Sequence, residues 1–417
     1  MPMSKEFENR LNPLLDKIVE HYGTPFHIYD EQGIRDTGAA LKGAFSGIEG
    51  FKEYFAVKAL PNPHVLQIMR DMDFGLDCSS ISELELSRSL GAHGAEIMFT
   101  SNNTSEADFL AAATDGGSIL NLDDISLVGK VPKMPELICF RYNPGERRTG
   151  NSIIGKPVEA KYGVAHDQLL DAYRQATDAG AKYYGLHTML ASNELNYTYM
   201  VETARMLFEI AEWIASALAI TFDFINIGGG LGIPYDPRQS PLDIQALAAG
   251  VTDLFQAFKK RNGYAPKIYM ESGRYMTGPH GVLVTKAINR KEIYRTYVGV
   301  DACMTALMRP GMYGAYHHIT VPARSGAEEV VDVVGSLCEN NDKFAIQRML
   351  PKIHDGDILC IHDTGAHGHA MGFNYNGKLR PKELLLRSDG RVELIRREET
   401  IGDLFATLNF EADLLEL

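Results

Sequence analysis

Short apolar, β-rich segments alternate along the first two thirds of the chain with longer segments that carry apolar residues at helical spacing. The strand candidates cover residues 54–59, 74–79, 97–101, 119–123, 137–143, 183–189, 224–230 and 267–273. Helical patterns such as HVLQIMRDM, SISELELSRSLGA and YMVETARMLFEIAEWIASALA lie between them. Because repeated strand and helix units join parallel strands through helical crossovers, this pattern predicts a parallel sheet of the α/β class.

Eight strands in about 230 residues match the number and size of a TIM barrel, although a doubly wound open sheet uses the same units. A barrel carries functional residues at the ends of many strands, whereas an open sheet gathers its ligand at one switch point. Polar or glycine residues end nearly every strand here, namely Lys58, Asp77, Arg141, His187, Gly228, Gly229, Gly230, Glu271 and Arg274. We therefore predict a TIM (β/α)8 barrel over residues 34–280.

The pattern changes after about residue 280, where strands follow one another with hardly any helical period between them. The segments are GVLVTKAI, YVGVD, HHITVPA, EVVDVVGSLC, GDILCIHD and ELLLRSDGRVELIRR. They predict a second, all-β domain, a sandwich or barrel, to which we assign residues 1–33 and 281–417. The segment TPFHIYD (24–30) predicts an extra strand that precedes the barrel and is placed to pair with it. A chain of 417 residues is long enough for two cores.

Composition narrows the classes of partner. The net charge of −13 argues against a nucleic-acid or anionic membrane partner, since both require a basic face. The N-terminal segment lacks a signal-type apolar core, and no apolar run approaches about 18 residues, so we expect a cytoplasmic protein without membrane contact. Five widely spaced cysteines without a C-x-x-C pair predict free thiols and no metal site.

The strongest local signal is INIGGGLGIPY, which places a glycine-rich loop after the seventh predicted strand. Backbone amides of such a loop can approach an anion without interference from Cβ atoms, and this position is a frequent phosphate site in TIM barrels. Arg274 at the end of the eighth strand can add a bidentate charge. The run fits neither the P-loop nor the dinucleotide pattern, so a phosphorylated cofactor or a sugar phosphate is the better fit.

A lysine at one strand end, a phosphate site across the barrel and a glutamate between them are the groups that pyridoxal phosphate requires. Lys58 supplies the amine for a Schiff base, and Glu271 is the natural partner for the ring nitrogen. A carboxylate at that nitrogen keeps the ring protonated and a strong acceptor of electrons. The predicted chemistry is therefore that of a pyridoxal phosphate enzyme.

Four motifs of the barrel, AVKALPNP, FGLDCSSISELELSRSLG, FINIGGGLGIPY and ESGR, occur in the order found in one enzyme family. VDACMTALMRPGMYGAYHHI, VVGSLCENNDKFA and NYNGKLRPKELLL continue the match through the second domain. With these motifs the sequence resembles the fold-type III pyridoxal-phosphate decarboxylases, most closely the diaminopimelate decarboxylases, over nearly the whole chain. The ESGR motif departs from the family's E-P-G-R by a serine in place of proline.

The resemblance implies roles for individual residues. Lys58 is the Schiff-base lysine, which Asp77 and Glu83 buttress, and Cys338 is the acid that protonates the substrate carbon after CO2 leaves. The implied cofactor-binding residues are Lys58, Asp77, His187, Met189, Ser192, Gly228, Gly229, Gly230, Glu271, Gly273, Arg274 and His367. The implied substrate-binding residues are Arg274, Arg309 and Tyr313 for a distal carboxylate and Glu339 for a distal amino group. The resemblance also implies a homodimer in which Cys338 and Glu339 serve the partner's Lys58.

The charges of the candidate substrates and of Arg309 favour meso-2,6-diaminopimelate as substrate and L-lysine as product. A pocket for ornithine, lysine or arginine gains nothing from a buried arginine such as Arg309, because those amino acids have no distal carboxylate. Two departures keep another diamino acid open. Met189 stands where the family has a histidine that stacks on the cofactor ring, and His367 stands where it has a tyrosine. A racemase is disfavoured by Glu271 and Cys338, and a cofactor-carrying binding protein by the large β domain.

Overall fold

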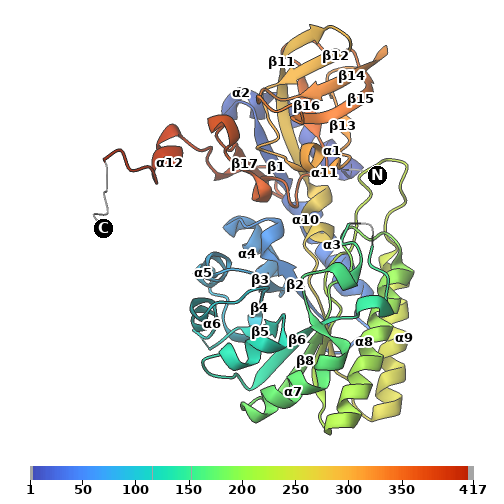
Figure 1. Ribbon diagram of the computed structural model, residues 1–417. Coiled ribbons are helices and arrows are strands. Elements are labelled where there is room, and N and C mark those ends of the chain that lie inside the picture. The colour runs from blue at the N-terminus through green and yellow to red at the C-terminus, as the bar shows by residue number, and fades with distance from the viewer. Residues whose placement is uncertain (1–2, 115, 152, 412–417) are drawn as a thin grey trace. The chain divides into compact units, whose positions relative to one another are not determined.

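The computed structural model describes residues 3–114, 116–151 and 153–411. The chain divides into two compact units. Unit 1 contains Glu31–Pro279, and unit 2 contains Met3–Asp30 together with the chain from His280 onward (Figure 1). Among the described residues, no helix is long and apolar enough to cross a membrane.

Unit 1 is a closed parallel barrel, which confirms the predicted TIM (β/α)8 fold. Within the described residues its eight strands are β2 (Lys52–Ala56), β3 (Gly75–Cys78), β4 (Ile97–Ser101), β5 (Ile119–Leu122), β6 (Leu137–Asn143), β8 (Tyr183–His187), β9 (Phe222–Asn226) and β10 (Lys267–Met270). Each strand pairs in parallel with the next, and β10 pairs with β2 to close the ring. The two-residue strand β7 (Val164–Ala165) adds to β6 outside the ring.

Helices surround this ring (Figure 1). They are α3 (Glu31–Ala44), α4 (Pro63–Asp71), α5 (Ile81–Ser89), α6 (Glu106–Ala112), α7 (Leu169–Asp178), α8 (Tyr197–Leu218), α9 (Ile244–Asn262) and the short α10 (Arg274–Thr277). Helix α3 precedes the first barrel strand and contacts α4 and α9, so it covers the place that a helix after β10 would take. Between β5 and β6 the crossover is a 3-10 segment (Ile125–Lys130), shorter than the helix usual in this fold.

Large aromatic side chains fill the barrel interior where neighbouring strands carry glycine. Tyr54, Phe224 and Tyr269 belong to one buried cluster contributed by six strands, and the rings of Phe224 and Tyr269 stack at 4.5 Å between centroids. A Cβ atom at Gly185 would lie 2.1 Å from the Phe224 ring, and one at Gly75 would lie 2.3 Å from the Tyr54 ring. These two glycines therefore provide the volume that the aromatic rings occupy.

Unit 2 is built mostly of sheet. Its strands are β1 (Phe26–Asp30), β11 (Gly281–Glu292), β12 (Thr296–Val300), β13 (Ile319–Thr320), β14 (Glu328–Val334), β15 (Lys343–Pro351), β16 (Ile358–Ile361), β17 (Lys382–Leu386) and β18 (Val392–Arg396). Its helices are α1 (Lys5–Leu11), α2 (Leu15–Tyr22), α11 (Arg309–Tyr313) and α12 (Ile401–Phe405). The predicted second β domain is confirmed, with α1 and α2 packed on one of its apolar clusters.

The N-terminal strand pairs differently from the prediction. Strand β1 runs antiparallel to β11 and parallel to β17, both strands of unit 2, so the expected pairing with the barrel is wrong. Phe26 and Ile28 are fully buried in a cluster with Val282, Val284 and Leu384. Burial of this apolar face against strands from the far end of the chain outweighs the closeness in sequence to the barrel.

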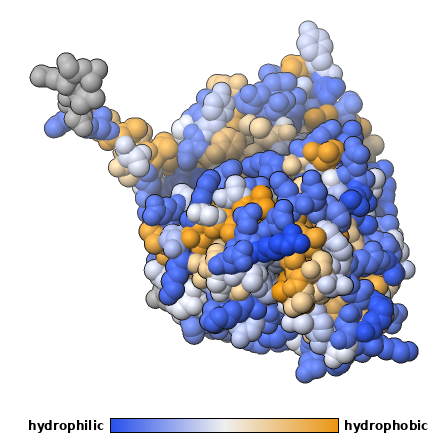
Figure 2. Space-filling model, turned by 60° about the horizontal axis from the view of Figure 1, so that its bottom comes forward, coloured by the Kyte–Doolittle hydropathy of each residue, from blue (hydrophilic) through white to orange (hydrophobic). Residues whose placement is uncertain are grey.

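A groove of about 670 Å³ lies at the amino-terminal side of the barrel strands. Phe109, Leu110 and Ala113 of the α6 region line one wall, and residues 131–137 line another. The groove adjoins the crossover between β5 and β6, where the usual helix is reduced to the 3-10 segment. Figure 2 shows a face of the molecule on which apolar stretches interrupt a largely hydrophilic surface.

Candidate active site

Lys58 lies one turn beyond the end of β2. The predicted strand over 54–59 ends at Ala56, and Val57–Ala59 form a 3-10 turn in which Val57 and Ala59 are buried and Lys58 is exposed. Of the two prolines that follow, Pro63 is the first residue of α4, whose N-cap Asn62 accepts a hydrogen bond from the His64 N–H. The break after the strand is therefore a helix start that leaves Lys58 projecting from the turn.

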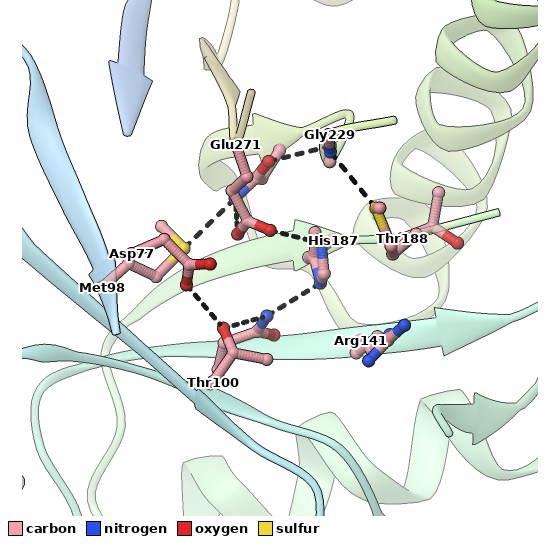
Figure 3. Close-up of polar contacts among 12 residues, drawn as sticks. Asp77, Met98, Thr100, Arg141, His187, Thr188, Gly229 and Glu271 are labelled. Carbon is pink, nitrogen blue, oxygen red and sulfur yellow. Dashed lines mark hydrogen bonds and ion pairs between the residues drawn. The ribbon is translucent and has the colours of Figure 1, made fainter. Parts of the chain in front are cut away.

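Polar side chains from neighbouring strands join in a buried chain at the carboxyl ends of the barrel strands (Figure 3). The Thr100 hydroxyl donates to Asp77 Oδ1 at 3.3 Å, and Asn121 Nδ2 donates to Thr100 Oγ1 at 3.1 Å. Asn121 Nδ2 also donates to His187 Nδ1 at 2.7 Å. Because Nδ1 accepts this bond, the ring proton of His187 lies on Nε2.

The Nε2 side of the His187 ring faces Glu271. His187 Nε2 lies 3.2 Å from Glu271 Oε2, and Asn226 Nδ2 donates to Glu271 Oε1 at 2.7 Å. Burial by itself would raise the pKa of Glu271, but His187, Lys58 and the Asn226 amide favour the anion more strongly and lower the pKa to about 2. Glu271 is therefore a carboxylate fixed from two sides over the whole physiological pH range.

Two other acidic residues that interact with Lys58, Asp77 and Glu83, behave differently. Burial raises the pKa of Asp77 well above its usual range, and the Glu271 charge adds to the effect while Lys58 opposes it. Burial also raises the pKa of Glu83, which Lys58 again opposes. Glu83 accepts a 2.7 Å hydrogen bond from the Ser79 N–H at the start of α5, so it holds the turn after β3 as well as facing the lysine.

The glycine loop after β9 has no room for side chains. Gly228 and Gly230 have φ of 74° and 92°, in the left-handed region that favours glycine. Added Cβ atoms would lie 2.2 Å from the Thr188 carbonyl oxygen at Gly228, 2.2 Å from that of Glu271 at Gly229 and 2.3 Å from that of Ala191 at Gly230. Asn226 Oδ1 accepts the Gly228 N–H at 2.9 Å, so one side chain orients both the loop and Glu271.

Arg274 and its neighbours complete the donor groups beside this loop. The guanidinium donates to the Tyr235 hydroxyl and, through Nη2, to Ser192 Oγ at 3.4 Å. Met189 Sδ accepts the Gly229 N–H at 3.3 Å, so the thioether lies against the glycine loop. Gly273 packs tightly against the lysine turn, because a Cβ atom there would lie 2.6 Å from Ala59 Cβ.

Arg141, singled out as a polar strand end, does not join this chain. Its Nη1 lies 3.4 Å from Asp123 Oδ1, and its guanidinium stacks 4.1 Å from the centre of the Tyr162 ring. Asp123 directly follows β5, and Tyr162 lies in the loop that follows β6. Arg141 therefore fixes the wall of the barrel mouth.

The other predicted residues belong to unit 2. Arg309, at the start of α11, is buried and contacts His317 Nε2 at 2.9 Å through Nη1, whereas Tyr313 at the end of that helix is 64% exposed. Cys338 is exposed in the loop between β14 and β15, where its N–H donates to Asn376 Oδ1 at 2.8 Å, and Glu339 follows it. His367 follows β16 with φ of 55°.

Four residues of the site escaped the sequence prediction: Thr100, Asn121, Asn226 and Tyr235. Each is a single polar residue at a strand end or in the glycine loop. Asn226 and Tyr235 lie inside the motif FINIGGGLGIPY, which was interpreted through its glycines alone. Thr100 and Asn121 have no motif around them, and the signal that identifies them is their place on β4 and β5, the two strands that follow the strand of Asp77 around the barrel.

Comparison with known proteins identifies the class to which this barrel belongs. Residues 34–278 match the family model described as pyridoxal-dependent decarboxylase, pyridoxal binding domain. The chain therefore belongs to the fold-type III pyridoxal-phosphate-dependent decarboxylases, and pyridoxal phosphate is its cofactor.

Individual relatives match over nearly their full length. The chain is 48% identical over 405 residues to protein TabA of Pseudomonas amygdali pv. tabaci, covering 97% of this chain and 95% of the relative. It is 37% identical over 409 residues to the diaminopimelate decarboxylase of Methanothermobacter thermautotrophicus, covering 96% and 95%. The crystal structure of diaminopimelate decarboxylase from M. jannaschii in complex with L-lysine superimposes with a TM-score of 0.86 at 28% identity, covering 94% and 93%.

The residues of unit 1 fit the cofactor. The glycine loop, Ser192, Tyr235 and Arg274 are neutral or cationic donors suited to a phosphate, and added Cβ atoms would fill the cradle. Glu271 is an anion held between His187 and Asn226, and an anion is the partner that a protonated ring nitrogen would bind. Lys58 is an exposed amine on the turn next to the Glu271 loop.

Proposed function

We propose that this enzyme decarboxylates meso-2,6-diaminopimelate to L-lysine and CO2. The observation that carries the proposal is Arg309, a buried cation at the head of α11 in a unit that also presents the exposed Tyr313. A cation in the substrate pocket favours a substrate with a second carboxylate, which diaminopimelate carries and ornithine, lysine and arginine lack. Relatives named as diaminopimelate decarboxylases support the same substrate.

In the proposed reaction Lys58 Nζ would hold the cofactor, and the substrate amine would take its place. The Ser192 hydroxyl, the glycine-loop amides and Arg274 would bind the phosphate, and Glu271 would accept a hydrogen bond from the ring nitrogen. Pyridoxal phosphate supplies the acceptor for the electron pair released when the bond between the α-carbon and its carboxylate breaks. Glu271 stays anionic because the Asn226 amide donates to it and His187 Nε2 lies 3.2 Å away, and such an anion would keep a ring nitrogen protonated.

The remaining proton comes from unit 2. We assign Cys338 Sγ as the donor that protonates the α-carbon once CO2 has left, and Glu339 as the group that binds the distal amine. Arg309 and Tyr313 bind the distal carboxylate. We further propose a homodimer in which Cys338 and Glu339 of one subunit serve Lys58 of the other. The exposure of Cys338 and Tyr313 within unit 2 supports this arrangement, because both side chains are accessible to a partner.

A second candidate is a decarboxylase for a different amino acid. Met189, which occupies the position of a ring-stacking histidine, lies against the Gly229 amide, so the environment of the cofactor differs from the family pattern. The 48% identity to TabA, a relative that is not named as a diaminopimelate decarboxylase, also favours this candidate.

A substrate panel separates the two. The purified enzyme with pyridoxal phosphate is incubated with meso-, LL- and DD-diaminopimelate, both enantiomers of lysine and ornithine, and arginine, and the released CO2 is measured. Release from meso-diaminopimelate well above the rest supports the proposal. Release from another amino acid with none from any diaminopimelate isomer supports the second candidate and refutes the first.

A further inference from the structure

A glutamate of the first barrel strand reaches the loop that carries Glu271. Glu53 is fully buried in β2, and its Oε1 accepts the backbone N–H of Ser272. The ladder between β2 and β10 pairs Tyr269 with Lys52 and Met270 with Glu53. Beyond this last pair, the side chain of Glu53 accepts a hydrogen bond from the N–H of Ser272, two residues after β10 ends.

This bond holds the peptide between Glu271 and Ser272. Glu271 receives a hydrogen bond from Asn226 of β9 on its side chain, and Ser272 is anchored through its backbone. The next residue, Gly273, packs against Ala56 and Ala59 of the lysine turn. Glu53 therefore ties the segment that carries Glu271 and Arg274 to the strand that carries Lys58.

Glu53 is in an environment that disfavours its charge. Burial raises its pKa well above the usual range, opposed by the hydrogen bonds from Ser272 and assisted by the charges of Glu271 and Asp77. A neutral Glu53 carboxyl keeps a carbonyl oxygen that accepts the Ser272 N–H, and it adds no further negative charge beside Glu271. Glutamine offers the same carbonyl oxygen, whereas leucine offers no acceptor.

The bond also explains the residue at position 272. Proline has no backbone N–H and cannot donate to Glu53. A proline at this position would leave the buried Glu53 carboxyl without the donor that it has here, which is costly in a site closed to water. Serine at 272 and glutamate at 53 are thus chemically matched.

We propose that Glu53 is a positioning residue of the cofactor site. By accepting the Ser272 N–H it fixes the direction in which Glu271 and Arg274 leave β10, and it requires a residue with an N–H at position 272. The proposal rests on the cofactor site and is independent of the choice of substrate.

The test uses five variants of the full chain: Glu53→Gln, Glu53→Leu, Ser272→Ala, Ser272→Pro and the double variant Glu53→Leu with Ser272→Pro. The measurements are the thermal unfolding of the apoprotein, the dissociation constant of pyridoxal phosphate by absorbance titration, and kcat and KM for the best substrate of the panel. Glu53→Gln and Ser272→Ala keep acceptor and donor, so we expect dissociation constants within about twofold of wild type.

Glu53→Leu and Ser272→Pro each remove one partner, and we expect each to weaken cofactor binding roughly tenfold and to lower kcat more than they change KM. In the double variant neither group remains to lack its partner across this contact. We therefore expect its fold-loss of cofactor affinity to be smaller than the product of the two single fold-losses. The proposal is overturned if Glu53→Leu lowers only the unfolding temperature and leaves cofactor binding within twofold, or if the two losses multiply. The cofactor titration distinguishes these outcomes even if no diaminopimelate isomer is decarboxylated.

Discussion

Asn226 contacts both Glu271 and the glycine loop, so a single substitution there should disturb two parts of the site. Its Nδ2 donates to Glu271 Oε1 at 2.7 Å and its Oδ1 accepts the Gly228 N–H at 2.9 Å, in a position with no solvent exposure. Asn226→Ala leaves a buried carboxylate oxygen and a buried amide each without this partner. At roughly 1–3 kcal/mol for each group, the expected loss of folding free energy is about 3 kcal/mol.

The same change should weaken the cofactor site. Without the Asn226 donor the pKa of Glu271 rises from about 2, and the glycine loop loses one of its anchors. Asn226→Asp separates the two effects, because it keeps an acceptor for the Gly228 N–H but places a second carboxylate beside Glu271. We expect both variants to bind pyridoxal phosphate more weakly, and the aspartate variant to shift the pH dependence of the cofactor absorbance further.

A matched control lies in the same barrel. Asn143 donates to the carbonyl oxygens of Pro157 and Tyr162 and accepts the Gly145 N–H, away from Glu271. Urea unfolding and cofactor absorbance are measured for Asn143→Ala beside the Asn226 variants. The control should lose a comparable amount of stability and keep the wild-type absorbance profile. If Asn226→Ala shows the profile of the control, Asn226 has no part in orienting Glu271 and the reasoning is refuted.

Three further outcomes are expected. Lys58→Ala should abolish the near-visible absorbance of the lysine-bound cofactor together with turnover; an absorbance spectrum and a CO2 assay check this, and residual turnover at the wild-type rate would contradict it. Met189→His should change turnover and cofactor absorbance, because an imidazole replaces the thioether beside Gly229; unchanged values would show that this position is irrelevant to the ring. Burial raises the pKa of Asp363 to about 7, so the folded protein holds this proton more tightly than the unfolded chain and stability falls as the pH rises from about 4 to 7. Asparagine tolerates the φ of 60° at this position, so Asp363→Asn should remove this pH dependence of the free energy of unfolding, by a few kcal/mol at most. Urea unfolding at pH 5 and 8 measures the difference, and an unchanged slope would contradict the assignment.

Much of the barrel follows from the sequence because its signals are local. Alternating apolar strands and helical periods set the order of elements, and the polar strand ends distinguish a barrel from an open sheet. The end of β2 was less predictable. YFAVKA keeps strand-like composition through Ala59, and the chain leaves the strand at Ala56 because the lysine turn packs against Gly273, a residue more than two hundred positions away.

Contacts distant in sequence account for the remaining differences. The pairing of β1 with β11 and β17 depends on which apolar faces meet after folding, which a local pattern does not specify. Thr100, Asn121 and Asn226 look like ordinary polar residues until the closed barrel brings their strands together. The serine in ESGR looked like a mere departure from a motif, and its role becomes visible when Glu53 is seen to accept its N–H.

The stoichiometry of the reaction with meso-2,6-diaminopimelate tests the central claim most directly. CO2 and lysine are quantified together over time for the wild-type enzyme with pyridoxal phosphate and for Lys58→Ala. We predict one L-lysine for each CO2 from the wild type and neither product from the variant. Absence of CO2 from meso-diaminopimelate, under conditions where the same enzyme preparation decarboxylates a different amino acid, would contradict the proposed function.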